Sequence, residues 1–150
     1  MSNGIKSTQE WQFDTVDTRT GIITHSEKRK NVITNAGISA IMSRIIGNND
    51  GHFYSHVAIG TGSRRETAAD TSLQAQVRKA AVSDATAFAD SHRIVARFSY
   101  DPDEGDQQIR EGGILDADDN LLARVTTVSP APLEAGRAVT ITITASLAQA

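Results

Sequence analysis

The strongest constraint on the fold is a strict two-residue alternation close to the C-terminus. Between residues 139 and 147, Val, Ile, Ile, Ala and Leu alternate with Thr, Thr, Thr and Ser. Successive side chains of a β-strand point to opposite faces, so this period predicts a strand with one apolar and one polar face. The stretch 93–100 repeats the pattern and places Ile94, Ala96 and Phe98 on one face with Tyr100. Both segments predict half-buried strands.

Composition supports the same fold class for the whole chain of 150 residues, which has the length of one domain. The chain holds 14 Ile, 9 Val and 15 Thr residues but only six Leu residues. Because β-branched residues favour strands and Leu favours helices, coiled coils, helical bundles and helical solenoids are excluded. With further strands expected at 11–16, 53–59, 109–115 and 121–128, we predict a mainly β fold: an antiparallel, jelly-roll-like β-sandwich of about seven to eight strands.

One short α-helix is predicted over residues 35–47. Four apolar residues recur at helical spacing and give the helix one apolar stripe: Ile38, Ile41, Met42 and Ile45. Asn35 is the expected N-cap, because its side chain can accept a hydrogen bond from the first helical turn. Gly47 is expected to end the helix in the left-handed conformation.

The first 30 residues are polar and differ in composition from the sandwich domain predicted at residues 31–150. They form either an N-terminal β-hairpin on the domain or an extended arm that docks on a neighbouring molecule. The sparse apolar content favours a weakly held segment. Trp11 and Phe13 are apolar anchors within this segment and are the candidate partner-binding residues.

Several classes of protein do not fit this sequence. The chain has no Cys, which excludes disulfides and thiolate metal ligands. No apolar run approaches the about 18 residues of a membrane span, and the N-terminus lacks the apolar core of a secretory signal. Fifteen basic residues are scattered among 18 acidic residues, with a net charge of −3. A nucleic-acid-binding protein usually shows a basic face, so we expect neither nucleic acid nor a membrane as a partner.

Three groups of residues contain possible metal ligands, but none has the spacing of a known site. His52 and His56 are four apart, and the predicted loop and strand would separate them by about 13 Å. The acidic segments 101–106 and 116–120 supply oxygen atoms that calcium accepts, without the EF-hand spacing. Asp and Asn are also common in turns for conformational reasons. We expect no metal and no cofactor, with calcium binding by the acidic loops left open.

The sequence does not assemble a catalytic set either. Gly60-Thr61-Gly62 begins like a phosphate-binding loop but lacks the Gly-Lys-Ser/Thr that completes one, so we interpret it as a sharp turn. Glu111 lies within an otherwise weakly polar strand and is a candidate catalytic acid. An ion pair with a nearby arginine, or hydrogen bonds from backbone donors, explains this carboxylate better. We therefore expect no enzymatic activity.

A series of short motifs follows along the chain in a fixed order. In sequence order they are Asn31-Val-Ile-Thr-Asn-Ala-Gly37, the apolar helix, His56-Val-Ala-Ile-Gly-Thr-Gly62, Thr67-Ala-Ala-Asp-Thr-Ser-Leu73, Gln76-Val-Arg-Lys79, Ile109-Arg-Glu-Gly-Gly-Ile-Leu-Asp-Ala-Asp118, Leu121-Leu-Ala-Arg124 and the Thr-alternating segment 139–147. The series resembles the N-terminal attachment domains of tail-collar fibre proteins of tailed bacteriophages, and the small stand-alone virion proteins related to them. The Gly112-Gly113 pair departs from the single Gly of the family pattern and suggests a bulge or a close backbone approach.

The resemblance implies a non-enzymatic structural component of a phage particle, located in the virion. Such a protein is expected to oligomerise, as a homotrimer or higher, and to dock on other virion proteins in the tail, baseplate, neck or fibre attachment. Capsid decoration is the alternative within this class. Fibre proteins continue into a shaft and a receptor-binding tip, whereas this chain stops at Ala150, so a stand-alone piece is expected.

Two functions of other classes stay open. A hydrolase on a β-sandwich would use Glu111 with Asp116 or a histidine. A carbohydrate-binding module would use Trp11, Tyr54 or Tyr100 as platforms for stacking on sugars. The chain has one Trp, two Tyr and four Phe residues, so rings exposed for sugar binding would leave few for the core.

Overall fold

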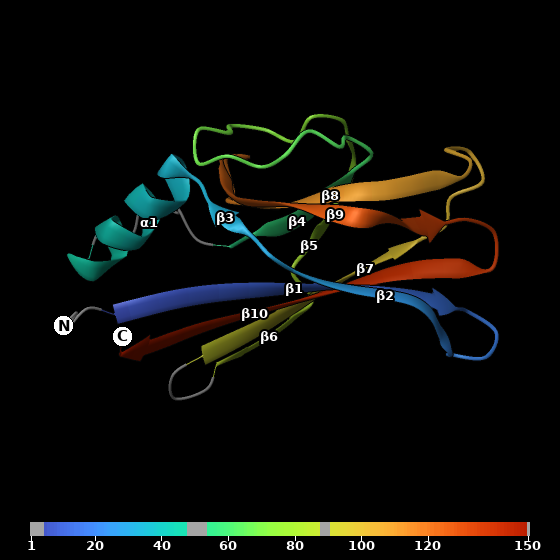
Figure 1. Ribbon diagram of the computed structural model, residues 1–150, viewed down its shortest axis with the longest axis horizontal. Helices are drawn as coiled ribbons and strands as arrows, with labels where there is room; N and C mark the ends of the chain where they lie inside the picture. Colours follow the sequence, from blue (N-terminus) through green and yellow to red (C-terminus); the bar gives the residue numbers. More distant parts are fainter. Residues whose placement is uncertain (1–4, 48–53, 88–90, 150) are drawn as a thin grey trace.

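The computed structural model of the protein describes residues 5–47, 54–87 and 91–149 (Figure 1). Two antiparallel five-stranded sheets face each other, and the helix α1 (Asn35–Ile45) lies at one end of them. Within the described residues the ten strands are β1 (Ile5–Asp17), β2 (Ile23–Lys30), β3 (Val32–Ile33), β4 (His56–Gly60), β5 (Gln76–Ala81), β6 (Asp84–Ala87), β7 (Ser91–Ser99), β8 (Gln107–Leu115), β9 (Leu121–Leu133) and β10 (Arg137–Gln149). The predicted mainly β, sandwich-like fold with one short helix is confirmed.

The described strands outnumber the seven to eight that the sequence predicts. β3 has two residues and β6 has four. The strands β3, β5 and β6 lack the apolar alternation that predicts β7 and β10. This pattern therefore does not identify them in the sequence. The jelly-roll detail of the prediction is not confirmed.

The chain crosses between the sheets at both edges of the sandwich. The β1 sheet has the order β2-β1-β10-β7-β6, and the β8 sheet has the order β3-β9-β8-β4-β5. Asn31 alone separates the edge strands β2 and β3, and Val82 and Ser83 separate the edge strands β5 and β6. The two sheets are therefore joined covalently along both sides, with the main core between them.

The longest strand pairing joins the two ends of the chain. β1 pairs antiparallel with β10 along 13 residues, from Ile5 opposite Gln149 to Asp17 opposite Arg137. β1 also pairs with β2, so residues 5–30 form a hairpin whose first strand lies inside the β1 sheet. The polar N-terminal segment thus contributes, from residue 5 onward, to the same sheet as the C-terminal strand.

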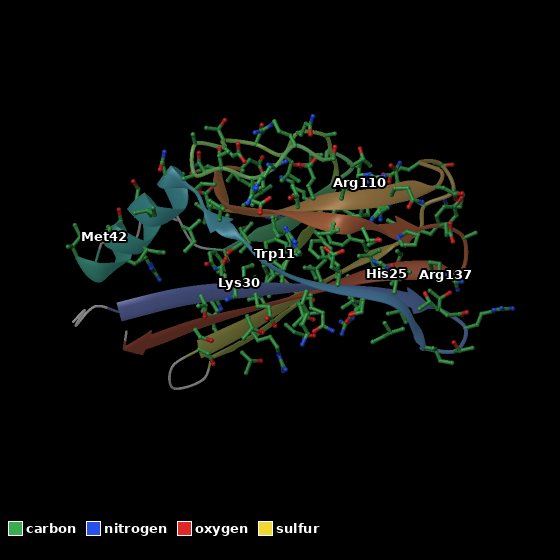
Figure 2. The ribbon with its side chains drawn as sticks, in the orientation of Figure 1. Trp11, His25, Lys30, Met42, Arg110 and Arg137 are labelled. Carbon is green, nitrogen blue, oxygen red and sulfur yellow. The ribbon has the colours of Figure 1, made fainter. Side chains whose placement is uncertain are left out.

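The main core contains the residues whose alternation predicts the strands. From β10 and β7, the buried side chains belong to the predicted apolar faces: Val139, Ile141, Ile143, Ile94, Ala96 and Phe98. Trp11 and Phe13 of β1 lie in the same core, with their ring centroids 5.8 Å apart in a stacked arrangement. Figure 2 shows Trp11 between the two sheets. The alternation therefore identifies the buried faces of β7 and β10 correctly. The burial of the Trp11 and Phe13 rings could not be predicted in this way, because their sequence neighbours are polar.

The β8 sheet is covered on both faces, which explains why β8 and β9 lack a clean two-residue alternation. On the inner face, a Cβ atom at Gly112 would lie 2.7 Å from the Trp11 ring. On the outer face, the loop 61–75 contributes Leu73 to a second buried cluster. A Cβ atom at Gly113 would lie 3.0 Å from the Leu73 side chain. The glycine pair therefore marks a close approach on both faces, one of the two interpretations given above.

The helix α1 packs on the sandwich through its smallest residues. A Cβ atom at Gly37 would lie 2.0 Å from Leu122 O, so only glycine permits this approach. The N-cap is Thr34 and not Asn35, since Thr34 Oγ1 accepts a hydrogen bond from Gly37 N at 3.1 Å. The prediction of Asn35 is wrong by one residue because the backbone of Asn35 is already helical and donates to Ala68 O at 2.8 Å.

Three residues of the predicted apolar stripe of α1 face solvent, and the side chain of the fourth, Ile45, lies outside the described part of the chain. Ile38, Ile41 and Met42 are 51%, 46% and 58% exposed, and Ile46 after the helix is 81% exposed. In Figure 2 the Met42 side chain lies on the helix, at the end of the molecule and away from the sheets. The helix ends as expected at Gly47, whose φ is +80°. No helix in the described part of the chain has both the length and the apolar character needed to cross a membrane.

Substituting Gly112 by Ala is expected to destabilise the fold by about 1–3 kcal/mol, because the added methyl group overlaps the Trp11 ring. Chemical denaturation at neutral pH measures the change in the free energy of unfolding. Ser99→Thr adds a methyl group at an exposed position of β7 and is the control, with an expected change within about 0.5 kcal/mol. A Gly112→Ala variant as stable as the control would contradict the packing of Trp11 against β8.

Candidate functional site

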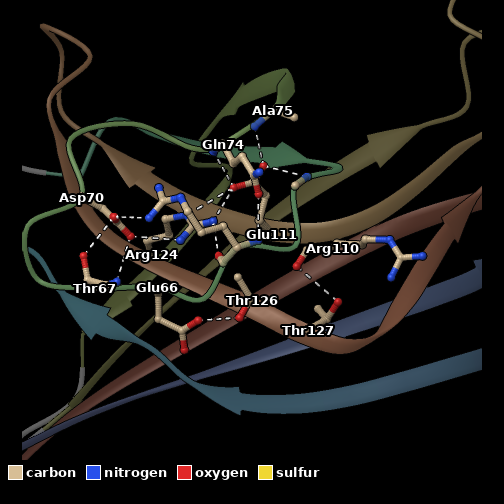
Figure 3. Close-up of polar contacts among 12 residues, drawn as sticks. Glu66, Thr67, Asp70, Gln74, Ala75, Arg110, Glu111, Arg124, Thr126 and Thr127 are labelled. Atoms are coloured by element: carbon tan, nitrogen blue, oxygen red, sulfur yellow. Dashed lines mark hydrogen bonds and ion pairs between the residues drawn. The ribbon is translucent and has the colours of Figure 1, made fainter.

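Glu111 lies at the centre of a buried polar network on the outer face of the β8 sheet (Figure 3). Its side chain has no solvent exposure, and its carboxylate accepts three backbone hydrogen bonds. The donors are Gly62 N at 2.9 Å, Gln74 N at 2.8 Å and Ala75 N at 2.7 Å. These donors belong to the two ends of the loop 61–75. One carboxylate therefore ties both ends of this loop to β8.

Arg124 of β9 balances the charge of Glu111. Its Nε and Nη2 atoms lie 3.2 and 3.0 Å from Glu111 Oε1, and its Nη1 atom lies 3.0 Å from Asp70 Oδ2. Nη2 also donates to Arg64 O at 2.7 Å. The side chains of Arg124 and Glu111 are completely buried, and that of Asp70 is 4% exposed. A buried charge is costly unless it is paired and hydrogen-bonded, and here all three groups meet that condition.

Asp70 holds the middle of the same loop. Its carboxylate accepts hydrogen bonds from Thr67 N at 2.9 Å and Thr67 Oγ1 at 3.0 Å, and it pairs with Arg64 at 2.9 Å. Burial acts to raise the pKa of Asp70, but the hydrogen bonds from Thr67, Arg64 and Arg124 outweigh it and lower the pKa from the ordinary 3.8 to about 2. Asp70 is therefore ionised at neutral pH, as its ion pair with Arg124 requires.

Two glycines allow the loop to approach the Glu111 carboxylate. A Cβ atom would lie 2.6 Å from Glu111 Oε2 at Gly60 and 2.5 Å from it at Gly62. The Gly60-Thr61-Gly62 segment shares one property with a phosphate loop: a backbone N–H group within it binds an anion. That anion is a side chain of the same chain, which agrees with the interpretation of the motif as a turn.

The carboxylates considered for hydrolysis have structural partners. Glu111 accepts hydrogen bonds from three backbone donors and from Arg124, as described above. The prediction that an arginine and backbone donors explain Glu111 is thus confirmed. Asp116 accepts hydrogen bonds from Asp118 N and Asn120 N, both at 2.9 Å, and so stabilises the turn between β8 and β9. Each carboxylate is engaged in holding its own loop.

The candidate metal ligands do not form a site in the part of the chain that the structure describes. His52 lies outside the described residues, and His56 is in β4. In the acidic loop 101–106, Glu104 pairs with Arg78 at 2.7 Å. No three His, Asp or Glu residues among those described are placed to hold a metal ion together.

The aromatic residues considered for binding are mostly engaged with the core. Trp11 and Phe13 have no exposed surface, so contact of either ring with a partner would require β1 to leave its sheet. Their partner-binding role stays a prediction. Tyr54 and Tyr100 are half-buried against the core. Burial raises the pKa of Tyr54, against the effect of a hydrogen bond that Gln9 Nε2 donates to its hydroxyl group.

A cavity of about 710 Å³ lies between α1 and the strands β6 and β7. The apolar part of its lining includes Ala40 and Ile41 of the helix and Ile94 of β7, and its polar part includes three basic side chains: Arg44, His92 and Arg93. The ring of His92 contacts that of Tyr54 edge-on, with centroids 5.6 Å apart, and burial lowers the pKa of His92. Pockets of about 300–1,000 Å³ commonly hold ligands. We name this pocket the helix cavity.

Sequence reasoning found Glu111 but missed its two charged partners. A signal for Arg124 was present, because it is the lone charge in the apolar run Leu121–Val125. In the β8–β9 pairing, Arg124 lies opposite Gly113, which is two residues from Glu111 along β8. Asp70 gave no comparable signal, since it comes from an irregular loop that only the folded chain brings near β9. The lining of the helix cavity comes from five separate segments of the chain, so the cavity could not be recognised before folding.

Comparison with known proteins gives a match to a family. The family model described as "Phage tail-collar fibre protein, N-terminal" matches residues 26–149. No curated protein and no solved structure matches the chain. The matched range contains every member of the Glu111 network and leaves out β1. The resemblance inferred from the motif series is confirmed by this match.

Replacing Arg124 by Met is expected to destabilise the protein by about 3–5 kcal/mol, because it leaves Glu111 and Asp70 buried without their shared cation. Urea denaturation measures the loss, and hydrogen exchange should increase first in the loop 61–75. Arg124→Lys keeps the charge without the planar fork and is expected to lose less. Arg65→Gln, at an exposed position, is the control. A loss in Arg124→Met no larger than in the control would refute the structural role of the network.

The low pKa of Asp70 predicts a specific dependence of stability on pH. Because the folded-state pKa is about 2 and the ordinary value is 3.8, the ionised form stabilises the fold above about pH 4 and this contribution is lost as the pH falls toward 2. Asp70→Asn should remove on the order of 2 kcal/mol at pH 7 and flatten this part of the pH profile. Urea denaturation between pH 7 and pH 2.5 tests this. Asp103→Asn, in an exposed loop, should keep the profile of the unmodified protein.

Proposed function

The chain belongs to the phage tail-collar fibre protein N-terminal family and has a structural role in a phage tail, and from this premise we propose that it acts by oligomerising and docking on other virion proteins. The oligomer is a homotrimer or higher, and the protein performs no catalysis. The observation that carries the proposal is the family match over residues 26–149, which spans all described strands except β1 and the start of β2.

The arrangement of polar and apolar groups supports a binding role. The buried charges Glu111, Arg124 and Asp70 hydrogen-bond within the chain and hold its own loop. In contrast, Ile38, Ile41 and Met42 of α1 expose about half of their surface to solvent. Grouped exposed apolar side chains are typical of surfaces that bind other proteins. The chain therefore offers a rigid scaffold with an apolar surface at one end.

The organisation of the N-terminus belongs to the same proposal. The family match begins at residue 26, which supports treating residues 1–30 as a separate element added to a domain at residues 31–150. Residues 5–30 of this element contain the paired strands β1 and β2. In the virion, its outer strand β2 lies at an edge of the β1 sheet, where a neighbouring molecule can reach it.

Cryo-electron microscopy of the parent phage tests the location. We expect density for this fold at the tail, the baseplate, the neck or the fibre attachment, in symmetry-related copies. Mass photometry of the purified protein tests the oligomer, with an expected mass at least three times the 16.0 kDa of one chain. Density on the capsid lattice would assign the protein to capsid decoration instead. A monomer in solution and in the particle would refute the oligomer.

A further inference from the structure

The exposed stripe of α1 and the helix cavity form one continuous apolar surface. Gly37 and Ala40 face the sandwich, whereas Ile38, Ile41 and Met42 face solvent. Ile41 belongs to both features, since it lies in the stripe and also lines the helix cavity. A partner that covers the stripe can therefore extend into the cavity without crossing a polar barrier. We call the stripe and the cavity together the helix-end surface.

An open strand edge borders this surface. β6 is the last strand of the β1 sheet, and all four of its residues are exposed. Ala85, Thr86 and Ala87 line the helix cavity. β6 contains no Lys and no Pro, which commonly block the edges of sheets, and its one charged residue, Asp84, pairs with Arg97 of β7 at 3.6 Å. The backbone of β6 is therefore accessible to an additional strand, with the cavity beside it.

The described residues of the helix cavity that can carry a charge at neutral pH are basic. Among the residues that the structure describes, the ionisable ones that line the cavity are Arg44, His92, Arg93 and Tyr54, with no Asp or Glu among them. Arg93 is exposed and makes no side-chain hydrogen bond or ion pair with the described part of the chain. Two copies that met through this surface would bring like charges together. The surface is therefore matched to a different protein that carries a carboxylate.

We propose that the helix-end surface accepts an extended segment of another phage tail protein, which pairs with the open edge of β6. This inference rests on the tail role proposed above. Alternate side chains of a strand face the same side, so every second residue of the segment enters the helix cavity beside Ala85 and Ala87. These residues are apolar, and a carboxylate of the segment pairs with Arg93.

This mode of binding fits the shape of the site. Backbone hydrogen bonds to a sheet edge supply affinity, and pockets for alternate side chains supply specificity. A cavity of about 710 Å³ has room for several side chains. It is also lined by the small residues Ala40, Ala85 and Ala87, which leave that room unfilled. The exposed side chains of α1 then cover the outer side of the bound segment.

Photo-crosslinking in the assembled phage tests which molecule lies on the surface. Met42 is replaced by p-benzoylphenylalanine in the protein made by the parent phage, and purified virions are irradiated. We expect an adduct with another tail protein, mapped by mass spectrometry to an extended segment of alternating apolar residues with a carboxylate. The same replacement at Val128, which is 75% exposed on β9 and outside the surface, is the control.

Each other outcome of the crosslinking has one meaning. An adduct between two copies of this chain, or none above the Val128 control, would overturn this inference and leave the tail role standing. An adduct with a helix of a tail protein would also overturn it, because the inference requires an extended segment. An adduct with the capsid protein would contradict the proposed function itself, so the two failures can be distinguished.

Substitutions on the surface test the apolar and the charged contacts separately. In phage complemented with variant protein, Ile41→Ser and Arg93→Glu should each lower the amount of the protein in purified virions about tenfold or more. Val128→Ser and Arg65→Glu, at exposed positions elsewhere, should leave it unchanged. Thermal unfolding of the purified variants checks that all four fold. Normal incorporation of both Ile41→Ser and Arg93→Glu by folded protein would overturn the inference.

Discussion

The ion pair between Glu111 and Arg124 imposes a constraint that the surrounding chain has to satisfy. Neither side chain reaches solvent, so every hydrogen bond that water would supply must come from the protein. Three backbone N–H groups of the loop 61–75 and the carboxylate of Asp70 fulfil this need. A long irregular loop is commonly mobile, but this one is held at both ends and in its middle by charged side chains.

The covering of the β8 sheet on two faces decides which parts of the fold the sequence can predict. β7 and β10 have one buried face, so their alternation predicts both the strand and the side that is buried. Residues 111–115 of β8 and 121–126 of β9 are buried on both faces, and the period is further disturbed by register shifts next to Glu111 and Leu115. The burial of Trp11 and Phe13 in β1 is missed for another reason, because Gln12 separates the two rings and polar residues flank them on both sides. Their isolation suggests a surface role, whereas in the sheet they complete the core.

The candidate site divides in the same way between local and long-range information. A carboxylate in an apolar strand requires donors, so the partners of Glu111 could be predicted by type from its surroundings alone. Which donors they are depends on the loop 61–75, and its path is set by the fold. Gly60, Gly62, Asp70 and Arg124 all lie within the motif series that carries the family resemblance. Those motifs therefore include the residues of the scaffold that holds the loop.

The scaffold nevertheless determines where the exposed helix lies. Thr67 and Asp70 fix the loop on either side of Ala68, and Ala68 O accepts the N–H of Asn35 at the start of α1. The Thr34 hydroxyl group also donates to Leu121 O, which attaches the same end of the helix to β9. Ile38, Ile41 and Met42 belong to the apolar helix of the motif series, but none of them takes part in the hydrogen bonds of the Glu111 network. Their side chains can therefore change without breaking a contact that holds the loop, so the network fixes the position of the helix and leaves its exposed chemistry independent of it.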